Sequence, residues 1–193
     1  MAEFTPWPRT VRLFRAITIT EKLDGTNAAL HISPDGQVVA QSRNRLITPN
    51  ADHHGFAGWA REHAEELAYI LGPGLHFGEW WGRGIQRGYG MEDRCFSVFN
   101  TDRWRKNDGP DTSKKLRAEQ SSILHQIDAV PVLYQGVFDQ AVIQGELMDL
   151  HWGGSVAAPG FMNPEGICVY HSQSRTVFKV TLDNNDAGKW EAA

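Results

Sequence analysis

The sequence predicts an α+β domain in which mainly antiparallel sheets are flanked by helices. Three observations favour this fold class. Strand-like runs outnumber helical runs along the 193 residues, and turn-forming Gly, Pro and Asp residues separate them. Helical runs interrupt the strands too irregularly for a repeated βαβ unit, which argues against a parallel sheet. The length suits one well-buried core, so we expect a single domain over residues 1–193.

The first half of the chain is expected to begin with an antiparallel meander. An alternating run ends at Lys22, the pair Asp24-Gly25 gives a turn, and two more strand-like runs follow. From residue 52, apolar residues recur at helical spacing until a Gly-Pro-Gly sequence stops them. The expected strands lie at 16–21, 28–32 and 38–42, and the expected helix lies at 52–71.

The second half of the chain alternates strand and helix signals. Apolar and β-branched residues predict further strands, which Gly-rich or charged connections separate. Two segments between them have helical character. The strands are expected at 75–81, 94–100, 130–134, 166–171 and 176–182, and the helices at 111–127 and 137–147.

Composition excludes several classes of protein. Hydrophobic residues make up 41% of the chain and charged residues 22%, as in globular domains rather than disordered or fibrous chains. The formal net charge of −4 argues against a uniformly basic surface, so nucleic acid would have to bind at a local patch. The sequence has no run of about 18 apolar residues and no targeting segment at its start. We therefore expect a cytoplasmic protein with no membrane partner.

The most informative stretch is Lys-Leu-Asp-Gly-Thr-Asn at residues 22–27. Taken alone, a strand followed by Asp-Gly and a second strand is also the pattern of an ordinary β-hairpin. The stretch resembles the nucleophile motif of covalent nucleotidyltransferases, which include ATP-dependent polynucleotide ligases and mRNA capping enzymes. The resemblance implies that Lys22 attacks ATP and carries AMP as a covalent intermediate.

Further segments resemble motifs of the same superfamily in the same order, closest to the RNA ligase 2-like branch of ATP-dependent RNA ligases. The resemblance implies the nucleotidyltransferase fold, which is an ATP-grasp-like DNA/RNA ligase fold, for an adenylation domain. Capping enzymes and many ligases append a C-terminal domain, but we expect no appended C-terminal OB or helical domain here. The matching segments are Ser42-Arg43, 76–86, 94–100, 154–161, 164–170 and 177–180.

The resemblance implies a nucleotide pocket that Asn27 and the backbone at Glu21 would help to shape. Arg43 would reach the ribose, and Glu79 would bind the ribose or a metal ion. Phe99 would stack on adenine; we prefer it to Phe96, which we expect on the same face of its strand. The residues expected to bind the nucleotide are Glu21, Leu23, Asn27, Arg43, Glu79, Phe99 and Lys179.

The resemblance also implies a metal site and a cation beside the transferred phosphate. Two glutamates supply the hard oxygen ligands that Mg²⁺ or Mn²⁺ requires. Lys179 would neutralise the α-phosphate, whereas Val177 stands where the family commonly has a second lysine. The expected catalytic residues are Lys22, Asp24 and Lys179, and the expected metal ligands are Glu79 and Glu165.

The resemblance therefore implies an ATP-dependent RNA ligase of RNA repair that acts on nicked or single-stranded RNA ends. Lys22 would take AMP from ATP and transfer it to an RNA 5′-phosphate, and a 3′-hydroxyl would then displace AMP and seal the strand. A protein partner or a homodimer would supply the missing domain. Two alternatives stay open, namely the adenylation core of a DNA ligase and a catalytically impaired module that binds nucleotide or RNA.

Overall fold

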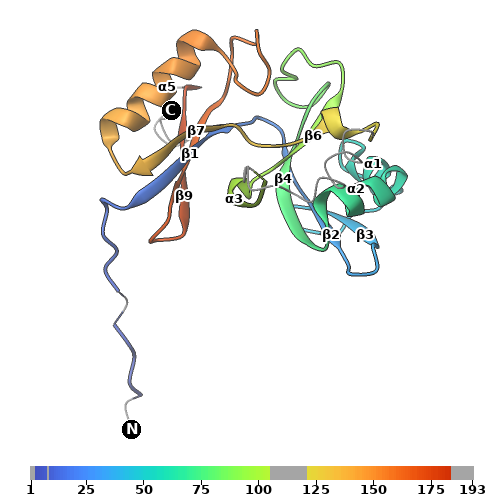
Figure 1. The fold of residues 1–193 in the computed structure, drawn as a ribbon, viewed down its shortest axis with the longest axis horizontal. Helices are drawn as coiled ribbons and strands as arrows, with labels where there is room; N and C mark the ends of the chain where they lie inside the picture. The colour runs from blue at the N-terminus through green and yellow to red at the C-terminus, as the bar shows by residue number, and fades with distance from the viewer. Residues whose placement is uncertain (1–2, 8, 105–120, 184–193) are drawn as a thin grey trace, which may run out of the picture.

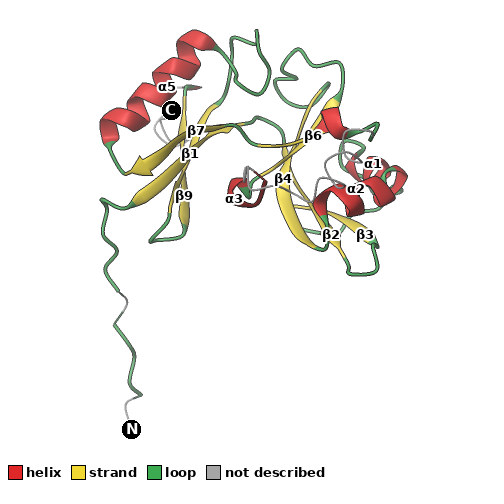
Figure 2. Ribbon diagram, in the orientation of Figure 1, coloured by secondary structure: helices red, strands yellow, loops and turns green. Residues whose placement is uncertain are grey.

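The computed structural model describes residues 3–7, 9–104 and 121–183. Within these residues two sheets form two lobes, with helices on their outer faces and one short helix between them (Figures 1 and 2). One sheet has the strand order β7-β1-β8-β9, and the other has the order β3-β2-β4-β5-β6. Every pairing is antiparallel except that of β5 with β6. The predicted α+β class with mainly antiparallel sheets is confirmed.

The strands begin and end close to the positions that the hydrophobic patterns predict. The short strand β6 was not predicted, and β7 begins two residues later than expected. The strands are β1 (Ala16–Lys22), β2 (Thr26–Ile32), β3 (Val38–Ser42), β4 (Gly74–Gly82), β5 (Arg94–Val98), β6 (Ile127–Ala129), β7 (Val132–Val137), β8 (Gly166–His171) and β9 (Thr176–Thr181).

The four-stranded sheet buries one of its faces against helix α5 (Gln140–Gly153). Ile17 and Ile19 of β1 lie on this face and are 2% and 0% exposed. Because successive side chains of a strand point to opposite faces, the intervening Thr18 and Thr20 lie on the other face. Lys22, at the end of β1, shares that second face, which is directed toward the other sheet.

The five-stranded sheet is divided in the same way. Leu30 and Phe96 are fully buried in a core with helices α1 (Phe56–Glu62) and α2 (Ala64–Leu71). Alternation along β4 places Glu79 on the opposite face from its neighbour Trp80, which is part of the helix-covered core. Both sheets therefore cover their outer faces with helices and direct polar side chains toward each other.

The expected meander of the first three strands is wrong at its first connection. β1 and β2 lie in different sheets, so the Asp24-Gly25 connection crosses from one lobe to the other and is not a hairpin turn. Gly25 is needed for space rather than for a positive φ. A Cβ atom there would lie 2.5 Å from the carbonyl oxygen of Trp80 and 2.8 Å from Cβ of Trp81. The crossing thus places the end of β1 beside the start of β2, where the two sheets meet.

Replacing Gly25 by alanine is expected to lower the free energy of unfolding by about 1–3 kcal/mol, because the backbone of β4 would have to move away from the new methyl group. Urea unfolding of the purified variant measures this. Gly145→Ala is the matched control, since Gly145 lies within α5 with no atom within 4 Å of an added Cβ. The control is expected to be as stable as the unsubstituted protein or up to about 1 kcal/mol more stable. A Gly25→Ala protein of unchanged stability would contradict the close approach.

The helices differ from expectation in three ways. The helix predicted over 52–71 is two helices, α1 and α2, which meet at His63. Helix α5 begins later than predicted because Asp139 caps it, with its carboxylate accepting a hydrogen bond from the Ala141 N–H at 2.8 Å. Most of the helix expected over 111–127 lies outside the described residues. Its described end is a 3₁₀ turn, η1 (Leu124–Gln126), followed by β6.

Candidate functional site

A cleft of about 600 Å³ lies where the two sheets face each other. Strands of both sheets contribute to its walls, together with the short helix α3 (Thr101–Trp104), which lies between the lobes in Figure 1. Besides Lys22, three of the lining residues are acidic. The cleft is lined by Thr18, Thr20, Glu21, Lys22, Leu23, Asn27, Glu79, Phe99, Asn100, Thr101, Asp102, Val130, Cys168, Tyr170 and Val177.

Lys22, which lines the cleft, is held by an ion pair. Its Nζ atom contacts Oε2 of Glu165, and the two side chains are 24% and 16% exposed. Glu165 immediately precedes β8, whose first residue, Gly166, pairs with Lys22 in the sheet. A Cβ atom at Gly166 would lie 2.2 Å from the carbonyl oxygen of Val180. The close packing of β8 against β9 therefore fixes the carboxylate beside the lysine.

Glu79 approaches the same lysine from the other sheet. Asn27 and Glu79 are partners in the β2–β4 pairing, and Nδ2 of Asn27 donates a hydrogen bond of 3.0 Å to Oε2 of Glu79. Burial raises the pKa of Glu79 from its ordinary 4.5 to about 7. The charge of Lys22 and the Asn27 hydrogen bond oppose this rise, whereas the negative charge of Glu165 adds to it. Two carboxyl groups from different sheets thus act on one ammonium group.

Glu79 and Glu165 have the donor chemistry for a divalent cation. Both are carboxylates that act on the same charge, and burial, opposed by the charge of Lys22, raises the pKa of Glu79. Within 3–7, 9–104 and 121–183, no group of three or more Asp, Glu, His or Cys side chains could hold a metal. Mg²⁺ commonly binds through one or two carboxylates plus waters and substrate phosphates, so these two residues fit the ion.

Phe99 and Phe96 lie on opposite faces of their sheet, contrary to expectation. They lie three positions apart, and an odd spacing in a strand changes the face. Phe96 is 0% exposed in the core beneath α1 and α2, whereas Phe99 is 44% exposed and lines the cleft. Of these two residues, Phe99 is the one that presents a ring on which a base could stack.

Lys179 lies on the cleft side of the edge strand β9. It is the pairing partner of Cys168, which lines the cleft, and the charges of both Lys22 and Lys179 act on the Cys168 thiol. Val177, two residues earlier on the same face, lines the cleft and is 60% exposed. Position 177 therefore offers the cleft an apolar surface, and Lys179 is the cation that β9 contributes.

Comparison with known proteins identifies the family. A family model described as RNA ligase matches residues 15–181. The chain belongs to the RNA ligase family. No curated protein matches this RNA ligase family member by sequence.

Solved structures support a nucleotidyltransferase-type fold for this RNA ligase family member. The similar structures include mutant forms of the RNA ligase of Naegleria gruberi. One, with ATP and Mn, is 17% identical with a TM-score of 0.58, and the match covers 89% of this chain and 51% of that one. Another, with AMP and Mn, is 17% identical with a TM-score of 0.55 over 88% and 50% of the two chains. The chain spans about half the length of these ligases.

Three residues that were predicted to bind the nucleotide or shape its pocket lie differently from the rest in this RNA ligase family member. Glu21 lines the cleft, yet its carboxylate is buried and accepts hydrogen bonds from Ser155 Oγ at 2.6 Å and from the N–H groups of Val156 and Ala157, both at 2.9 Å. Burial raises its pKa. Its side chain thus anchors the loop after α5 rather than facing the cleft.

Leu23 and Arg43 also differ from expectation. Leu23 touches the cleft but is 4% exposed and belongs to a small core with Trp81 and Tyr89. Arg43 is exposed just beyond the end of the edge strand β3 and is not among the residues that line the cleft. The structure therefore brings together Lys22, Asn27, Glu79, Phe99 and Glu165, with Lys179 on the same wall, and leaves Arg43 outside.

Sequence reasoning missed Arg87. Its side chain contacts three chain segments that adjoin predicted site residues. Its Nε donates to Oδ2 of Asp24 at 2.9 Å, and its Nη1 donates to the carbonyl oxygen of Asn163 at 3.2 Å. Its Nη2 contacts Asp183, just after β9. The Tyr89 hydroxyl also accepts from the Asp24 N–H at 2.9 Å. Arg87 thus links the chain after Lys22, the chain before Glu165 and the chain after Lys179.

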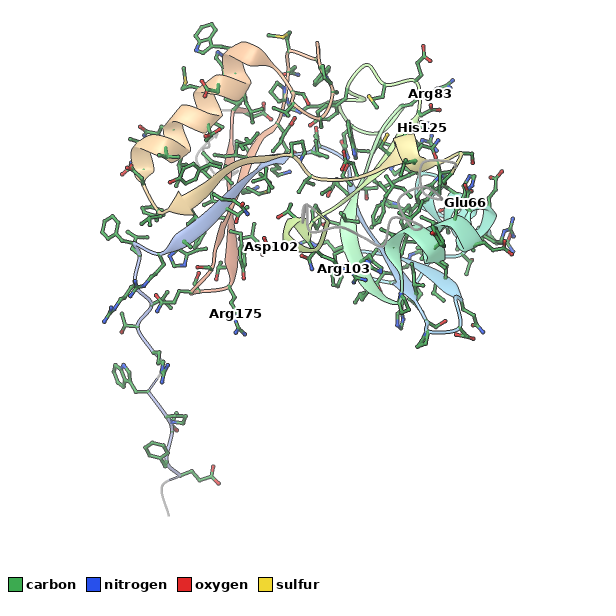
Figure 3. All side chains as sticks on the ribbon, viewed as in Figure 1. Glu66, Arg83, Asp102, Arg103, His125 and Arg175 are labelled. Atoms are coloured by element: carbon green, nitrogen blue, oxygen red, sulfur yellow. The ribbon has the colours of Figure 1, made fainter. Side chains whose placement is uncertain are left out.

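Arg87→Ala is expected to lower the free energy of unfolding by about 2–3 kcal/mol, because Asp24 would keep its partly buried charge without its partner. Arg87→Lys is expected to recover only part of this loss, since one ammonium cannot reach the same set of acceptors. Urea unfolding measures both. Arg83→Ala is the control, because Arg83 is exposed and reaches the Glu92 carbonyl oxygen only at 3.5 Å (Figure 3). Equal stability of the Arg87→Ala and Arg83→Ala proteins would contradict the linking role.

No helix within the described part of the chain is long and apolar enough to cross a membrane.

Proposed function

We propose that this protein is an ATP-dependent RNA ligase whose nucleophile is Lys22. The observation that carries the proposal is the position of the Lys22 amine, which lies in a cleft between two sheets with a carboxylate from each side of the cleft acting on it. Membership of the RNA ligase family favours RNA over DNA as the strand that is joined. The Naegleria ligases with ATP or AMP and Mn support a nucleotide and a divalent cation as the other components.

The proposed reaction has three steps. The unprotonated Lys22 nitrogen attacks the α-phosphorus of ATP, an N–P bond forms, and pyrophosphate leaves. An oxygen of the RNA 5′-phosphate then attacks the same phosphorus, the N–P bond breaks, and AMP is joined to the RNA through a pyrophosphate linkage. Finally a 3′-hydroxyl attacks the RNA phosphate, and AMP leaves as the strand is sealed.

The residues around Lys22 suit these steps. Glu165 accepts the ammonium hydrogen bond and so aims Nζ into the cleft. Without a bound metal ion, burial raises the pKa of Glu79 to about 7, so its carboxyl group can exchange a proton beside the amine near neutral pH before the metal binds. Glu79 and Glu165 would hold Mg²⁺ or Mn²⁺, which would neutralise phosphate charge when bound.

Other residues of the cleft are proposed to bind the nucleotide. The exposed ring of Phe99 would stack on adenine, and Lys179 would approach the α-phosphate from β9. Asn27 would keep the Glu79 carboxyl group in place. Because Val177 supplies no charge, we propose that a partner, a second copy or another part of a longer protein adds a cation during the reaction. The described chain would then act as the adenylation domain in a cytoplasmic RNA repair reaction.

The experiment that tests the function is RNA joining. The protein is incubated with ATP, Mg²⁺ or Mn²⁺ and RNA that carries a labelled 5′-phosphate, either nicked on a splint or single-stranded. We expect AMP-capped RNA and joined product, both lost when a chelator removes the metal. If neither product forms with any of these RNAs while ATP still binds, the protein is better described as a catalytically impaired binding module. The observation that favours this alternative is the apolar residue at position 177.

A further inference from the structure

A second, smaller hollow of about 270 Å³ lies next to the cleft on the five-stranded sheet. Phe99 and Asn100 line both spaces, so the hollow adjoins the cleft. Its own walls include Leu75 and Phe77 of β4 and Arg103 of α3. The proposed reaction uses none of these three side chains.

The floor of the hollow is an exposed apolar surface. Leu75 is 47% exposed, Phe77 is 53% exposed and Phe99 is 44% exposed. Phe77 and Phe99 lie beside each other across the strand pair, since the Phe99 N–H donates to the Phe77 carbonyl oxygen at 2.9 Å. The opposite face of these strands is covered by α1 and α2. Two aromatic side chains on neighbouring strands therefore face outward beside the proposed reaction centre.

Arg103 places a positive charge at the wall of the hollow. Its Nη2 donates to the Leu71 carbonyl oxygen at 3.0 Å, which holds the guanidinium near the end of α2. The preceding residue, Asp102, lines the cleft instead, so the two neighbours on α3 serve different spaces (Figure 3). An aromatic surface with an adjoining cation is the combination that binds single-stranded nucleic acid, through base stacking and phosphate contact.

We propose that this hollow binds one nucleotide of single-stranded RNA next to the end that reacts in the cleft, with its base on Phe77 and its phosphate near Arg103. The proposal rests on the proposed function for the identity of the strand. The lining residues that the hollow shares with the cleft favour RNA over another occupant, because the nucleotide that follows the reacting end must lie on an adjoining surface. The volume is slightly below the roughly 300 Å³ at which small-ligand pockets begin, so it suits one base rather than a helix of a partner protein.

Fluorescence anisotropy with a labelled single-stranded RNA of about ten nucleotides, within the usual site sizes, tests the proposal. Phe77→Ala is expected to weaken binding about fivefold or more at constant salt, since stacking contributes about 1 kcal/mol or more for each base. The dependence of affinity on salt should not change in this variant. Phe178→Ala is the matched control, because Phe178 is 55% exposed but does not line either space. It should bind RNA as the unsubstituted protein does.

Arg103→Gln separates the charge from the aromatic contact. Glutamine keeps an N–H donor for the Leu71 carbonyl oxygen but loses the positive charge. The slope of log affinity against log salt should decrease in magnitude by about 0.7, as expected for one lost phosphate contact on a single strand. A series of RNA probes, each with an abasic site at a different position, locates the stacked nucleotide. The Phe77→Ala and unsubstituted proteins should have equal affinity for the probe whose abasic site replaces that nucleotide.

Three outcomes would overturn the proposal. The first two are equal RNA affinity of the Phe77→Ala and unsubstituted proteins, and absence of measurable RNA binding at low salt. The third is that Phe77→Ala keeps its RNA affinity but loses self-association, as measured by sedimentation. The last would assign the surface to a second copy of the chain. Covalent AMP on the unsubstituted protein is measured separately. Failure of the proposed function therefore shows as a missing adduct, whereas failure of the subsite shows as an RNA affinity that does not depend on Phe77.

Discussion

Lys22→Ala is expected to abolish covalent attachment of AMP and ATP-dependent RNA joining while the protein remains folded. The amine is the proposed site of the N–P bond, and methyl cannot replace it. Lys179 cannot substitute, because it lies two strands away from β1 in the sheet, on β9, and does not share the Glu165 contact. Incubation with ATP labelled at the α-phosphate, followed by denaturing electrophoresis, measures the adduct.

Two further variants show whether charge or nucleophilicity is lost. Lys22→Arg keeps a positive charge next to Glu165 but offers a guanidinium, which stays protonated and is not a nucleophile. It is also expected to form no adduct. Arg61→Ala removes an exposed charge from α1, which covers the face of its sheet opposite the cleft, and is expected to form the adduct normally. Persistence of the adduct in Lys22→Ala would show that another residue carries AMP.

The metal-free protein is expected to lose stability as the pH rises from about 4.5 to about 7, because of Glu79. The carboxyl group keeps its proton up to about pH 7 in the folded state and releases it near 4.5 when unfolded. The folded state therefore binds more protons in this window, and the free energy of unfolding decreases with rising pH. The difference corresponds to about 3 kcal/mol for a carboxyl group that is only 8% exposed.

Glu79→Gln tests this contribution directly. The amide has no proton to lose and still offers an oxygen to Asn27, so the variant should be more stable than the unsubstituted protein by up to about 3 kcal/mol above pH 7. Urea unfolding from pH 5 to pH 8 in the presence of a chelator measures the difference. Glu62→Gln, at an exposed position of α1, should leave the pH dependence unchanged. Parallel pH profiles for Glu79→Gln and the unsubstituted protein would contradict the burial of an uncompensated charge.

The strands could be predicted from the sequence because alternation of apolar and polar residues is a local property. Ile17 and Ile19 alternate with polar residues, and this pattern defined both the strand and its buried face. The partner of each strand is not a local property. Asp24-Gly25 has the composition of a hairpin turn, yet tight packing of Gly25 against β4 sends the chain to the second sheet. The pattern therefore predicted the strands but not their assignment to two sheets.

The candidate site was predictable to the extent that its residues lie in recognisable motifs. Lys22, Glu79 and Glu165 are brought together although more than 50 residues separate each from the next in the chain. Arg87 could not be predicted, because its contact with Asp24 spans 63 residues and leaves no periodic pattern. A signal that could have pointed to Arg87 was the expectation that Asp24, if partly buried, would need a basic partner. The burial of the Glu21 carboxylate against the loop after α5 likewise depends on a contact across 134 residues.

Peptide mapping by mass spectrometry after incubation with ATP and Mg²⁺ or Mn²⁺ tests whether Lys22 carries AMP. We expect the protein to gain the mass of one AMP, with ATP but not with GTP or NAD, and the peptide containing Lys22 to carry it through a phosphoramidate bond that acid cleaves. An adduct on a different residue, or no adduct with either metal in a protein that binds ATP, would contradict the assignment of Lys22 as the nucleophile.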